Sequence, residues 1–285
     1  MNILITGSNG QLGTELRLLA QQHPEHRYVF TDIQELDITH EAAVQALVEQ
    51  EQVDCIINCA AYTAVDKAES DPALCTLLNA TAPALLAAAM EQRGGIMLHI
   101  STDYVFDGTA HVPYTEDAPT HPQSTYGRTK LMGEEAVRQA CRRSIILRTA
   151  WLYSPWGNNF VKTMMRLGRE RDALGVVFDQ VGTPTYAADL AQAILTILGQ
   201  DIVPGTYHFT NEGVTSWYDF ALAIHRLSGI TTCHVRPLHT ADYPTPAQRP
   251  HYSVLDKTKV KDTYHLAIPH WEESLRQCIR RLQEQ

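Results

Sequence analysis

A tyrosine and a lysine four residues apart, Tyr126 and Lys130, carry the clearest chemical signal in the sequence. On a helix this spacing puts both side chains on one face. A free tyrosine has a pKa of about 10, and a neighbouring ammonium favours the phenolate and lowers that pKa. Such a pair also occurs on ordinary surface helices. Thr102, 24 residues before Tyr126 at the end of an expected strand, makes the pattern more specific for chemistry. Together the three residues predict a proton-transfer site.

A second chemical signal lies at the N-terminus, where Gly7, Gly10 and Gly13 follow the apolar run 3–5. This pattern predicts a buried strand, a tight turn and a helix. Glycine allows the sharp turn and a close approach of the backbone to a ligand, and the N–H groups at the helix start suit a pyrophosphate. A strand–turn–helix without a ligand shows the same glycines. Their place in the first strand of the chain favours a dinucleotide.

Informative residues also follow the other expected strands. Asp32 lies about 20 residues beyond the turn, where a carboxylate accepts hydrogen bonds from the adenosine ribose and repels a 2′-phosphate; a helix-capping aspartate is the alternative. Asp37 and Ile38 are expected beside the adenine, and small residues around Ala60 let a flat cofactor pass. The predicted cofactor contacts are Gly7, Asn9, Gly10, Gln11, Leu12, Gly13, Asp32, Asp37, Ile38, Cys59, Ala60, Ala61, Tyr62, Thr63, Tyr126 and Lys130.

Positioning these residues requires a parallel sheet, and the chain shows the necessary alternation of strand and helix patterns. Strands are expected at 3–6, 28–31, 53–58, 96–100 and 144–148, and helices at 41–49, 80–92, 158–169 and 187–198. Such alternation is typical of right-handed βαβ units with helices on both faces, and ligands bind beyond the carboxyl ends of the strands. The expected fold is therefore α/β, a Rossmann-type doubly wound parallel sheet with a smaller discontinuous α/β substrate domain.

The two expected domains divide the chain unevenly. Residues 1–149 are expected to form the dinucleotide-binding domain, with 164–200 returning to it. Residues 150–163 and 201–285 are expected to form most of the substrate domain, with the site in the cleft between the two. Arg249, just before a proline in this second part, suits bidentate contact with a nucleotide diphosphate. An exposed arginine without a role is the alternative.

Composition excludes several classes of partner. The chain has 285 residues, is 44% hydrophobic and 19% charged, and has a net charge of −9. This acidity argues against a nucleic-acid partner. No apolar run approaches the length of a membrane span, and the N-terminus enters the first strand directly, so a cytoplasmic protein with reduced cysteines is expected. The histidines form no close ligand set, so no catalytic metal is predicted.

Several longer segments resemble the extended short-chain dehydrogenase/reductase family. They are GSNGQLGTEL from Gly7, NCAAYTAVDKAES from Asn58, STDYVFDG from Ser101, YGRTKLMGE from Tyr126, RTAWLY from Arg148, VGTPTYAADLA from Val181, GTYHFTNEG from Gly205 and RPHYSVLD from Arg249. The resemblance runs nearly end to end. It implies that Thr102, Tyr126 and Lys130 are the catalytic trio. It also implies that Asp103, Tyr104 and Trp151 contact the substrate. With Thr102 and Arg249, these are the predicted substrate contacts.

The resemblance also implies a reaction. NADPH or NADH is expected to reduce the C4 ketone of dTDP-4-dehydro-β-L-rhamnose to dTDP-β-L-rhamnose, a precursor for polysaccharides. A nucleotide-sugar epimerase or dehydratase of the same family is the alternative, and a non-catalytic cofactor-binding regulatory subunit is a more distant one. The protein is expected to be a monomer or a homodimer. Mg²⁺ is expected at most as a structural ion at an interface, where Glu15 is a candidate ligand, and it is not predicted.

Overall fold

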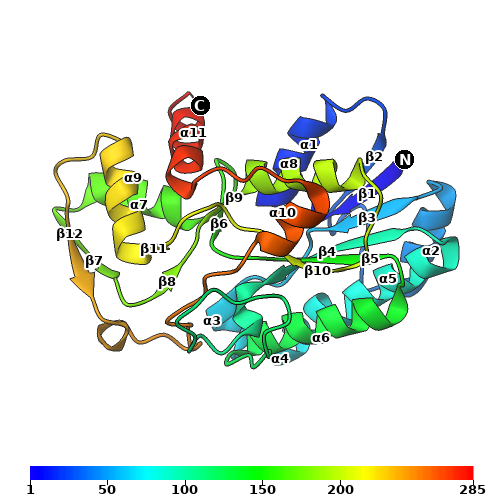
Figure 1. Ribbon diagram of the computed structural model, residues 1–285, viewed down its shortest axis with the longest axis horizontal. Coiled ribbons are helices and arrows are strands. Elements are labelled where there is room, and N and C mark those ends of the chain that lie inside the picture. Colours follow the sequence, from blue (N-terminus) through cyan, green and yellow to red (C-terminus); the bar gives the residue numbers. More distant parts are fainter. Residues whose placement is uncertain (285) are drawn as a thin grey trace.

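The protein is built around a six-stranded parallel sheet, as the computed structural model, which describes residues 1–284, shows (Figure 1). The strands are β1 (Asn2–Thr6), β2 (Arg27–Thr31), β3 (Cys55–Asn58), β4 (Ile96–Thr102), β5 (Ser144–Thr149) and β10 (Gly205–His208). Their order across the sheet is β10-β5-β4-β3-β1-β2, so the strand order reverses between β1 and β3. Ligands in doubly wound sheets bind outside such a reversal point. The predicted α/β fold is confirmed.

Alternation along the strands explains why helices cover both faces. Ile3 and Ile5 are buried with Leu12 and Leu16 in one apolar cluster, whereas Leu4 is buried in another cluster on the opposite face. Successive strand side chains point to opposite faces, so a strand that is apolar at every position is buried on both. Helices α1 and α8 lie over the first face, and α2, α5 and α6 over the second (Figure 1).

The helices of these layers follow the expected periodicity. Helix α1 buries Leu12 and Leu16, four residues apart, and α8 begins and ends at the predicted residues. Side-chain caps start others: Ser124 accepts from Gly127 N at the start of α6. The bounds are α1 (Gln11–Ala20), α2 (Glu41–Gln50), α3 (Val65–Ala68), α4 (Pro72–Thr76), η1 (Leu77–Thr81), α5 (Ala82–Arg93), η2 (Asp103–Val105), α6 (Thr125–Ala140), α8 (Ala187–Leu198) and α10 (Thr258–Tyr264).

A smaller lobe packs beside the sheet around its own apolar cluster, which includes Val161, Phe220 and Leu275 (Figure 1). Strands β7 and β12 pair in parallel, while β8 and β11 pair antiparallel. The elements are β6 (Leu152–Tyr153), α7 (Phe160–Glu170), β7 (Ala173–Val177), β8 (Val181–Gly182), β9 (Thr185–Tyr186), β11 (Thr215–Ser216), α9 (Trp217–Leu227), β12 (His234–Leu238), η3 (Thr240–Asp242) and α11 (Trp271–Gln283).

Two segments lie on the other side of the expected domain boundary. Strand β10, at 205–208, adds to the large sheet beside β5, because Tyr207 and Phe209 are buried in the same cluster as Ile145. Conversely, α7 and β7 pack with α9 in the smaller lobe. We therefore keep the division into a dinucleotide-binding and a substrate domain as a proposal, with 205–208 moved to the first and 164–177 to the second.

One helical run qualifies the expectation that no segment reaches membrane-spanning length. The continuous helix Pro72–Arg93 has 22 residues, and an 18-residue window within it has a mean hydropathy of 1.6, which by length and composition would suffice to cross a bilayer. Half of that window is buried. Its α5 part packs against α2 and α6 within the cluster under the sheet, so it is a core helix of this fold. The expectation of a protein without a membrane partner stays a prediction. Within residues 1–284 all six cysteines are free.

Candidate active site

A cavity of about 760 Å³ opens at the carboxyl ends of the strands. The predicted residues that line it are Gly7, Gly10, Gln11, Leu12, Gly13, Asp32, Ile38, Cys59, Ala60, Ala61, Thr63, Thr102, Asp103, Tyr104, Tyr126, Lys130 and Trp151. Thus the glycine turn, the catalytic candidates and most substrate candidates meet in one space. Four predicted residues, Asn9, Asp37, Tyr62 and Arg249, do not line it, and their roles stay predictions.

The glycine turn forms one end of the cavity. Gly7 has φ +63°, and a Cβ at this position would lie 2.7 Å from Ala60 Cα, so the turn after β1 packs backbone to backbone on the segment after β3. A Cβ at Gly13 would lie 2.5 Å from Ser8 Cα, so α1 sits against the turn. The first N–H groups of α1 therefore point at the cavity end, where a phosphate would bind.

Asp32 lies at the end of β2, on the same side of the cavity. Its Oδ2 accepts from Asn9 N at 3.0 Å and its Oδ1 from Ile33 N at 2.9 Å. Each carboxylate oxygen retains capacity for a ribose hydroxyl. Beside it, Ile33 and Ile38 line the cavity as an apolar surface, whereas Asp37 turns away and accepts from Thr39 N and Oγ1.

Tyr126 and Thr102 meet at the other end of the cavity. Burial raises the pKa of the Tyr126 phenol, and the hydrogen bond with the Thr102 hydroxyl opposes the rise only in part. The expectation that Lys130 lowers this pKa is therefore not met in this structure. At neutral pH the phenol is protonated, which is the form that donates a proton.

Lys130 is held from behind by groups that the sequence analysis missed. Its Nζ donates to Ile100 O at 2.6 Å and lies 3.4 Å from Nε2 of His99, and it is only 2% exposed. His99 in turn bonds Asn58 at 3.0 Å, and Asn58 accepts from Thr6 Oγ1 at 2.7 Å. Burial lowers the pKa of Lys130 to about 8, while Glu134 favours the charged form. The signal for this network was polar residues inside otherwise apolar strands.

Asp103 and Tyr104 continue from Thr102 in the short helix η2. Asp103 is 2% exposed; its Oδ1 accepts from Thr102 Oγ1 at 3.0 Å, and within residues 1–284 its buried Oδ2 has no hydrogen-bond partner. Burial raises the pKa of Asp103 to about 6, although the Ser253 and Thr102 hydroxyls favour the carboxylate and oppose part of the rise. Tyr104 packs edge-on against Tyr126, with ring centroids 5.5 Å apart. Both residues line the same cavity as Tyr126.

Arg249 lies outside the cavity and is already paired. Its two terminal nitrogens donate to the carboxylate oxygens of Asp66 at 2.9 and 2.8 Å, a bidentate ion pair between the 245–250 segment and α3. Asp66 belongs to the AVDKAE segment, whose neighbouring Val65 lines the cavity. A diphosphate contact from Arg249 would therefore have to form beside Asp66 or in its place, which spacing alone did not reveal.

A buried ion pair fixes α6, which carries Tyr126 and Lys130, to the sheet. Glu134 is fully buried and accepts from Arg148 Nε at 2.8 Å and Nη2 at 2.7 Å. Ser101 Oγ donates to the same carboxylate at 2.6 Å. Because Ser101 and Arg148 lie on β4 and β5, one carboxylate sets the position of α6 over both strands.

No metal site accompanies these residues: within residues 1–284 no group of three or more His, Cys, Asp and Glu side chains could hold an ion. Glu15, considered above as an interface ligand, is buried rather than exposed. It accepts from Arg281 Nη1 at 2.9 Å and from Trp156 Nε1 at 3.0 Å. Its carboxylate thus joins α1 to α11 across the two lobes.

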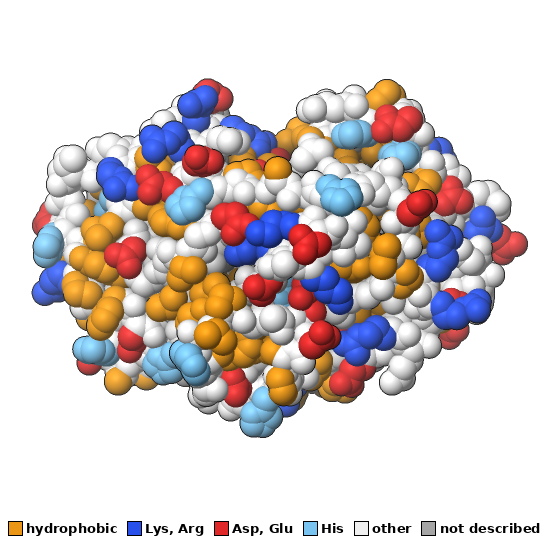
Figure 2. Space-filling view, in the orientation of Figure 1, with side chains coloured by type: hydrophobic (Ala, Val, Ile, Leu, Met, Phe, Trp, Pro, Cys, Tyr) orange, Lys and Arg blue, Asp and Glu red, His pale blue; other side chains and the backbone are white. Residues whose placement is uncertain are grey.

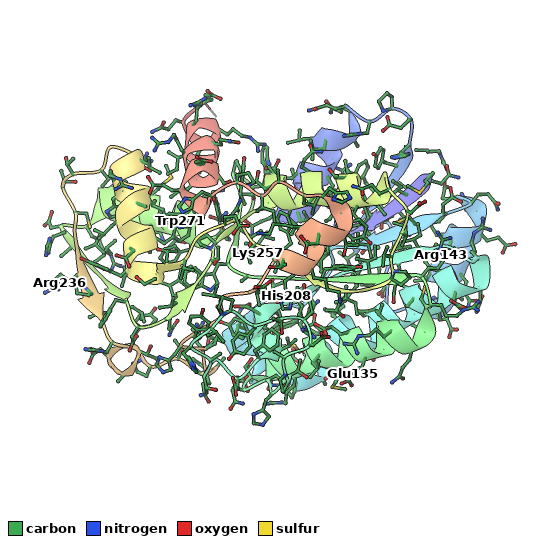
Figure 3. All side chains as sticks on the ribbon, viewed as in Figure 1. Glu135, Arg143, His208, Arg236, Lys257 and Trp271 are labelled. Carbon is green, nitrogen blue, oxygen red and sulfur yellow. The ribbon has the colours of Figure 1, made fainter. Side chains whose placement is uncertain are left out.

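Charged side chains of both signs are interspersed over the face shown in Figure 2, and no single-sign field extends across it. Arg236 and Arg143 lie near opposite ends of the molecule, whereas His208 and Lys257 lie near its middle (Figure 3).

Comparisons with known proteins agree with this geometry. The family model described as RmlD substrate binding domain matches residues 1–284. A dTDP-4-dehydrorhamnose reductase structure from Clostridium acetobutylicum is 46% identical, with a TM-score of 0.95 over 99% of this chain and 100% of that one. One from Bacillus anthracis, in complex with NADP, is 39% identical, with a TM-score of 0.94 over 98% and 99%. A probable dTDP-4,6-dihydroxy-2-methyloxan-3-one 4-ketoreductase of Streptomyces antibioticus is 44% identical over 98% and 95%. Its similarity to dTDP-4-dehydrorhamnose reductases extends over almost its full length. The chain therefore belongs to the RmlD substrate binding domain family.

Proposed function

We propose that this protein is an NAD(P)H-dependent reductase of a dTDP-linked 4-keto sugar, and that it converts dTDP-4-dehydro-β-L-rhamnose into dTDP-β-L-rhamnose. One observation carries the proposal: the glycine turn and the Thr102–Tyr126–Lys130 trio lie at two ends of a single cavity. Similarity to dTDP-4-dehydrorhamnose reductases over nearly the whole chain supports the choice of sugar. A dTDP-sugar is then its small-molecule partner.

The cavity fits a nicotinamide dinucleotide by its chemistry. The helix N-terminus suits the pyrophosphate, the carboxylate of Asp32 suits ribose hydroxyls, and Ile33 and Ile38 offer an apolar surface to the adenine. When bound, this cofactor supplies the hydride, and the protein contributes position and charge. The Bacillus anthracis relative holds NADP, whereas Asp32 would repel a 2′-phosphate. We therefore propose that NADPH and NADH both serve.

The chain's own residues handle the proton. Reduction of a ketone creates an alkoxide, and Tyr126, protonated at neutral pH, donates the proton that neutralises it. Thr102 lines the cavity with Tyr126, and its hydroxyl favours ionisation of the phenol. Lys130, oriented by Ile100 O and His99, places its ammonium under the site, where it can hold the nicotinamide ribose.

Asp103, Tyr104 and Trp151 line the cavity on the sugar side. The buried Oδ2 of Asp103 needs a donor, which a sugar hydroxyl supplies. Arg249, lying outside the cavity beside Tyr104, is the candidate for the diphosphate. Binding energy from this remote handle would position the ketone at Tyr126.

Two other functions make distinguishable predictions. A 4-ketoreductase acting on a different dTDP-sugar is favoured by the Streptomyces relative, and it would prefer another 4-keto substrate. An epimerase or dehydratase would keep its cofactor through a full redox cycle, and a dehydratase needs an acid–base pair where this chain has Asp103 followed by Tyr104. Tightly bound cofactor in the purified protein would favour this class.

The test is consumption of NADPH and NADH with the 4-keto sugar generated in situ from dTDP-glucose by the preceding enzymes. We expect stoichiometric oxidation of either cofactor and dTDP-β-L-rhamnose as the product. No oxidation with this sugar, but oxidation with another dTDP-4-keto sugar, would reassign the substrate. No oxidation with any would favour the non-catalytic alternative.

A further inference from the structure

Trp151 lies on the sugar side of the cavity in a conformation that bulky residues rarely adopt. It follows β5 and has φ +49°, in the left-handed region. Such a backbone persists only where the surroundings hold it. Part of the hold is local, because Trp151 O accepts from Thr185 N at 3.2 Å next to the β6–β9 pairing. That bond fixes the backbone and leaves the indole to be placed by other contacts.

The indole of Trp151 is stacked on that of Trp217. The ring centroids are 3.6 Å apart and the planes meet at 12°, so the two rings lie face to face. The ring of Phe160 contacts Trp217 as well, with its centroid 4.6 Å from that of Trp217. Trp217 does not line the cavity, yet it covers one face of a side chain that does.

Gly182 closes the edge of the same indole. A Cβ at Gly182 would lie 2.8 Å from Cζ2 and 2.9 Å from Cε2 of Trp151, so only glycine leaves room for the ring. Gly182 on β8 pairs with Thr215 on β11, and β11 leads directly into Trp217, the first residue of α9. One antiparallel strand pair of the smaller lobe thus presents both contacts to Trp151.

We propose that Trp217 is a positioning residue for the sugar site, acting through Trp151. The inference rests on the proposed function. Through the stack, the position of β8, β11 and α9 fixes the indole of Trp151, which forms the part of the cavity wall against which the sugar binds. The stack involves neither the glycines of the turn nor Asp32, although Gln11 Nε2 donates to Leu152 O at 3.5 Å beside Trp151. Loss of the Trp217 ring therefore weakens productive binding of the dTDP-sugar and leaves cofactor binding intact.

The experiment compares Trp217→Leu, Trp217→Phe and, as a matched control, Trp271→Phe. Trp271, at the start of α11 toward α9, packs edge-on against Phe220 in the same lobe and is not in the stack (Figure 3). Two stacked indoles couple their transitions and give a paired band in far-ultraviolet circular dichroism, which reports the stack directly. KM for the 4-keto sugar, kcat and the NADPH dissociation constant are measured on each folded variant.

We expect Trp217→Leu to lose the paired band and to raise KM for the sugar about 3- to 10-fold, the effect of losing one aromatic stack. kcat and the NADPH dissociation constant should change less than about twofold. Trp217→Phe should lose the paired band too, with a smaller rise in KM, and it serves in place of Trp217→Leu if the leucine variant does not fold. Trp271→Phe should keep both the band and KM.

An unchanged KM in a Trp217 variant that has lost the band overturns the inference. A parallel rise of the sugar KM and the NADPH dissociation constant overturns it too, because that pattern reports general loosening. The proposed function fails separately: the wild-type protein would then not turn over the 4-keto sugar at all.

Discussion

Replacing Asp103 with asparagine should stabilise the cofactor-free protein at neutral pH. The carboxylate is 2% exposed, and its only paired oxygen accepts from Thr102 Oγ1 at 3.0 Å in the part of the chain that the structure describes. Burial raises its pKa from the ordinary 3.8 to about 6. Ionisation of Asp103 thus costs more free energy in the folded protein than in the unfolded chain. Functional residues often lower the stability of a protein in this way.

The sign and size follow from that difference. With a raised pKa, the folded protein binds the proton more tightly than the unfolded chain does. Stability is therefore fully present below pH 3.8 and falls as the pH rises through about 6. The difference between the two pKa values corresponds to a loss of about 3 kcal/mol of stability at pH 7.5, and about half of this loss has occurred by pH 5. Because asparagine does not ionise, Asp103→Asn should be about 1–3 kcal/mol more stable at pH 7.5, allowing for a weaker bond to Thr102.

The assay is urea unfolding of the cofactor-free wild type and variant between pH 5 and 8. The advantage of Asp103→Asn should grow with pH up to about pH 6.5 and then level off. Asp107→Asn is the control of opposite sign: hydrogen bonds from Thr109 N and the Tyr114 hydroxyl lower the pKa of Asp107, so its replacement should destabilise the protein. A stability difference at Asp103 that is zero, or the same at every pH, would refute the reasoning.

Three further changes test other parts of the site. Glu134→Gln leaves the buried guanidinium of Arg148 without its carboxylate and should cost about 3–5 kcal/mol in urea unfolding, whereas Arg138→Ala, which removes a half-exposed partner, should cost under about 1 kcal/mol; equal effects would contradict this view. Asp32→Ala should weaken NADH and shift the ratio of dissociation constants toward NADPH, each tenfold being about 1.4 kcal/mol; an unchanged ratio would leave Asp32 as a cap only. Arg249→Ala should raise KM for the dTDP-sugar without changing NADPH affinity, because loss of a charged hydrogen bond costs roughly 1.5–3 kcal/mol of binding energy. Equal weakening of both ligands would show that its pair with Asp66 serves only to hold the lobes together.

The sequence predicted the sheet well because its strands are short apolar runs that each end in a residue with a chemical reason to be there. Strands that begin at Ile96 and Ser144 were located to within two residues at either end. Strand β10 was not identified as part of the sheet, since four residues, 205–208, give too short a pattern to show which sheet they join. Its place depends on the burial of Tyr207 against the core, a tertiary contact.

The site was predictable where a residue acts by its own chemistry and its place after a strand. Thr102, Tyr126 and Asp32 are of this kind, and all three line the cavity. Residues that act by holding another were missed, because their signal is a distance across the fold. His99 reaches Lys130 from β4, and Trp217 reaches Trp151 from the start of α9, 66 positions further along the chain.

The central claim is that Tyr126 gives the proton to the reduced ketone, and Tyr126→Phe tests it most directly. The variant keeps the ring that packs against Tyr104 and removes only the hydroxyl, so folding and NADPH binding should survive. Turnover of dTDP-4-dehydro-β-L-rhamnose is measured beside the NADPH dissociation constant. We expect turnover to fall about 10²- to 10⁴-fold with cofactor affinity unchanged. Retention of more than about a tenth of wild-type turnover by the folded variant would contradict the account.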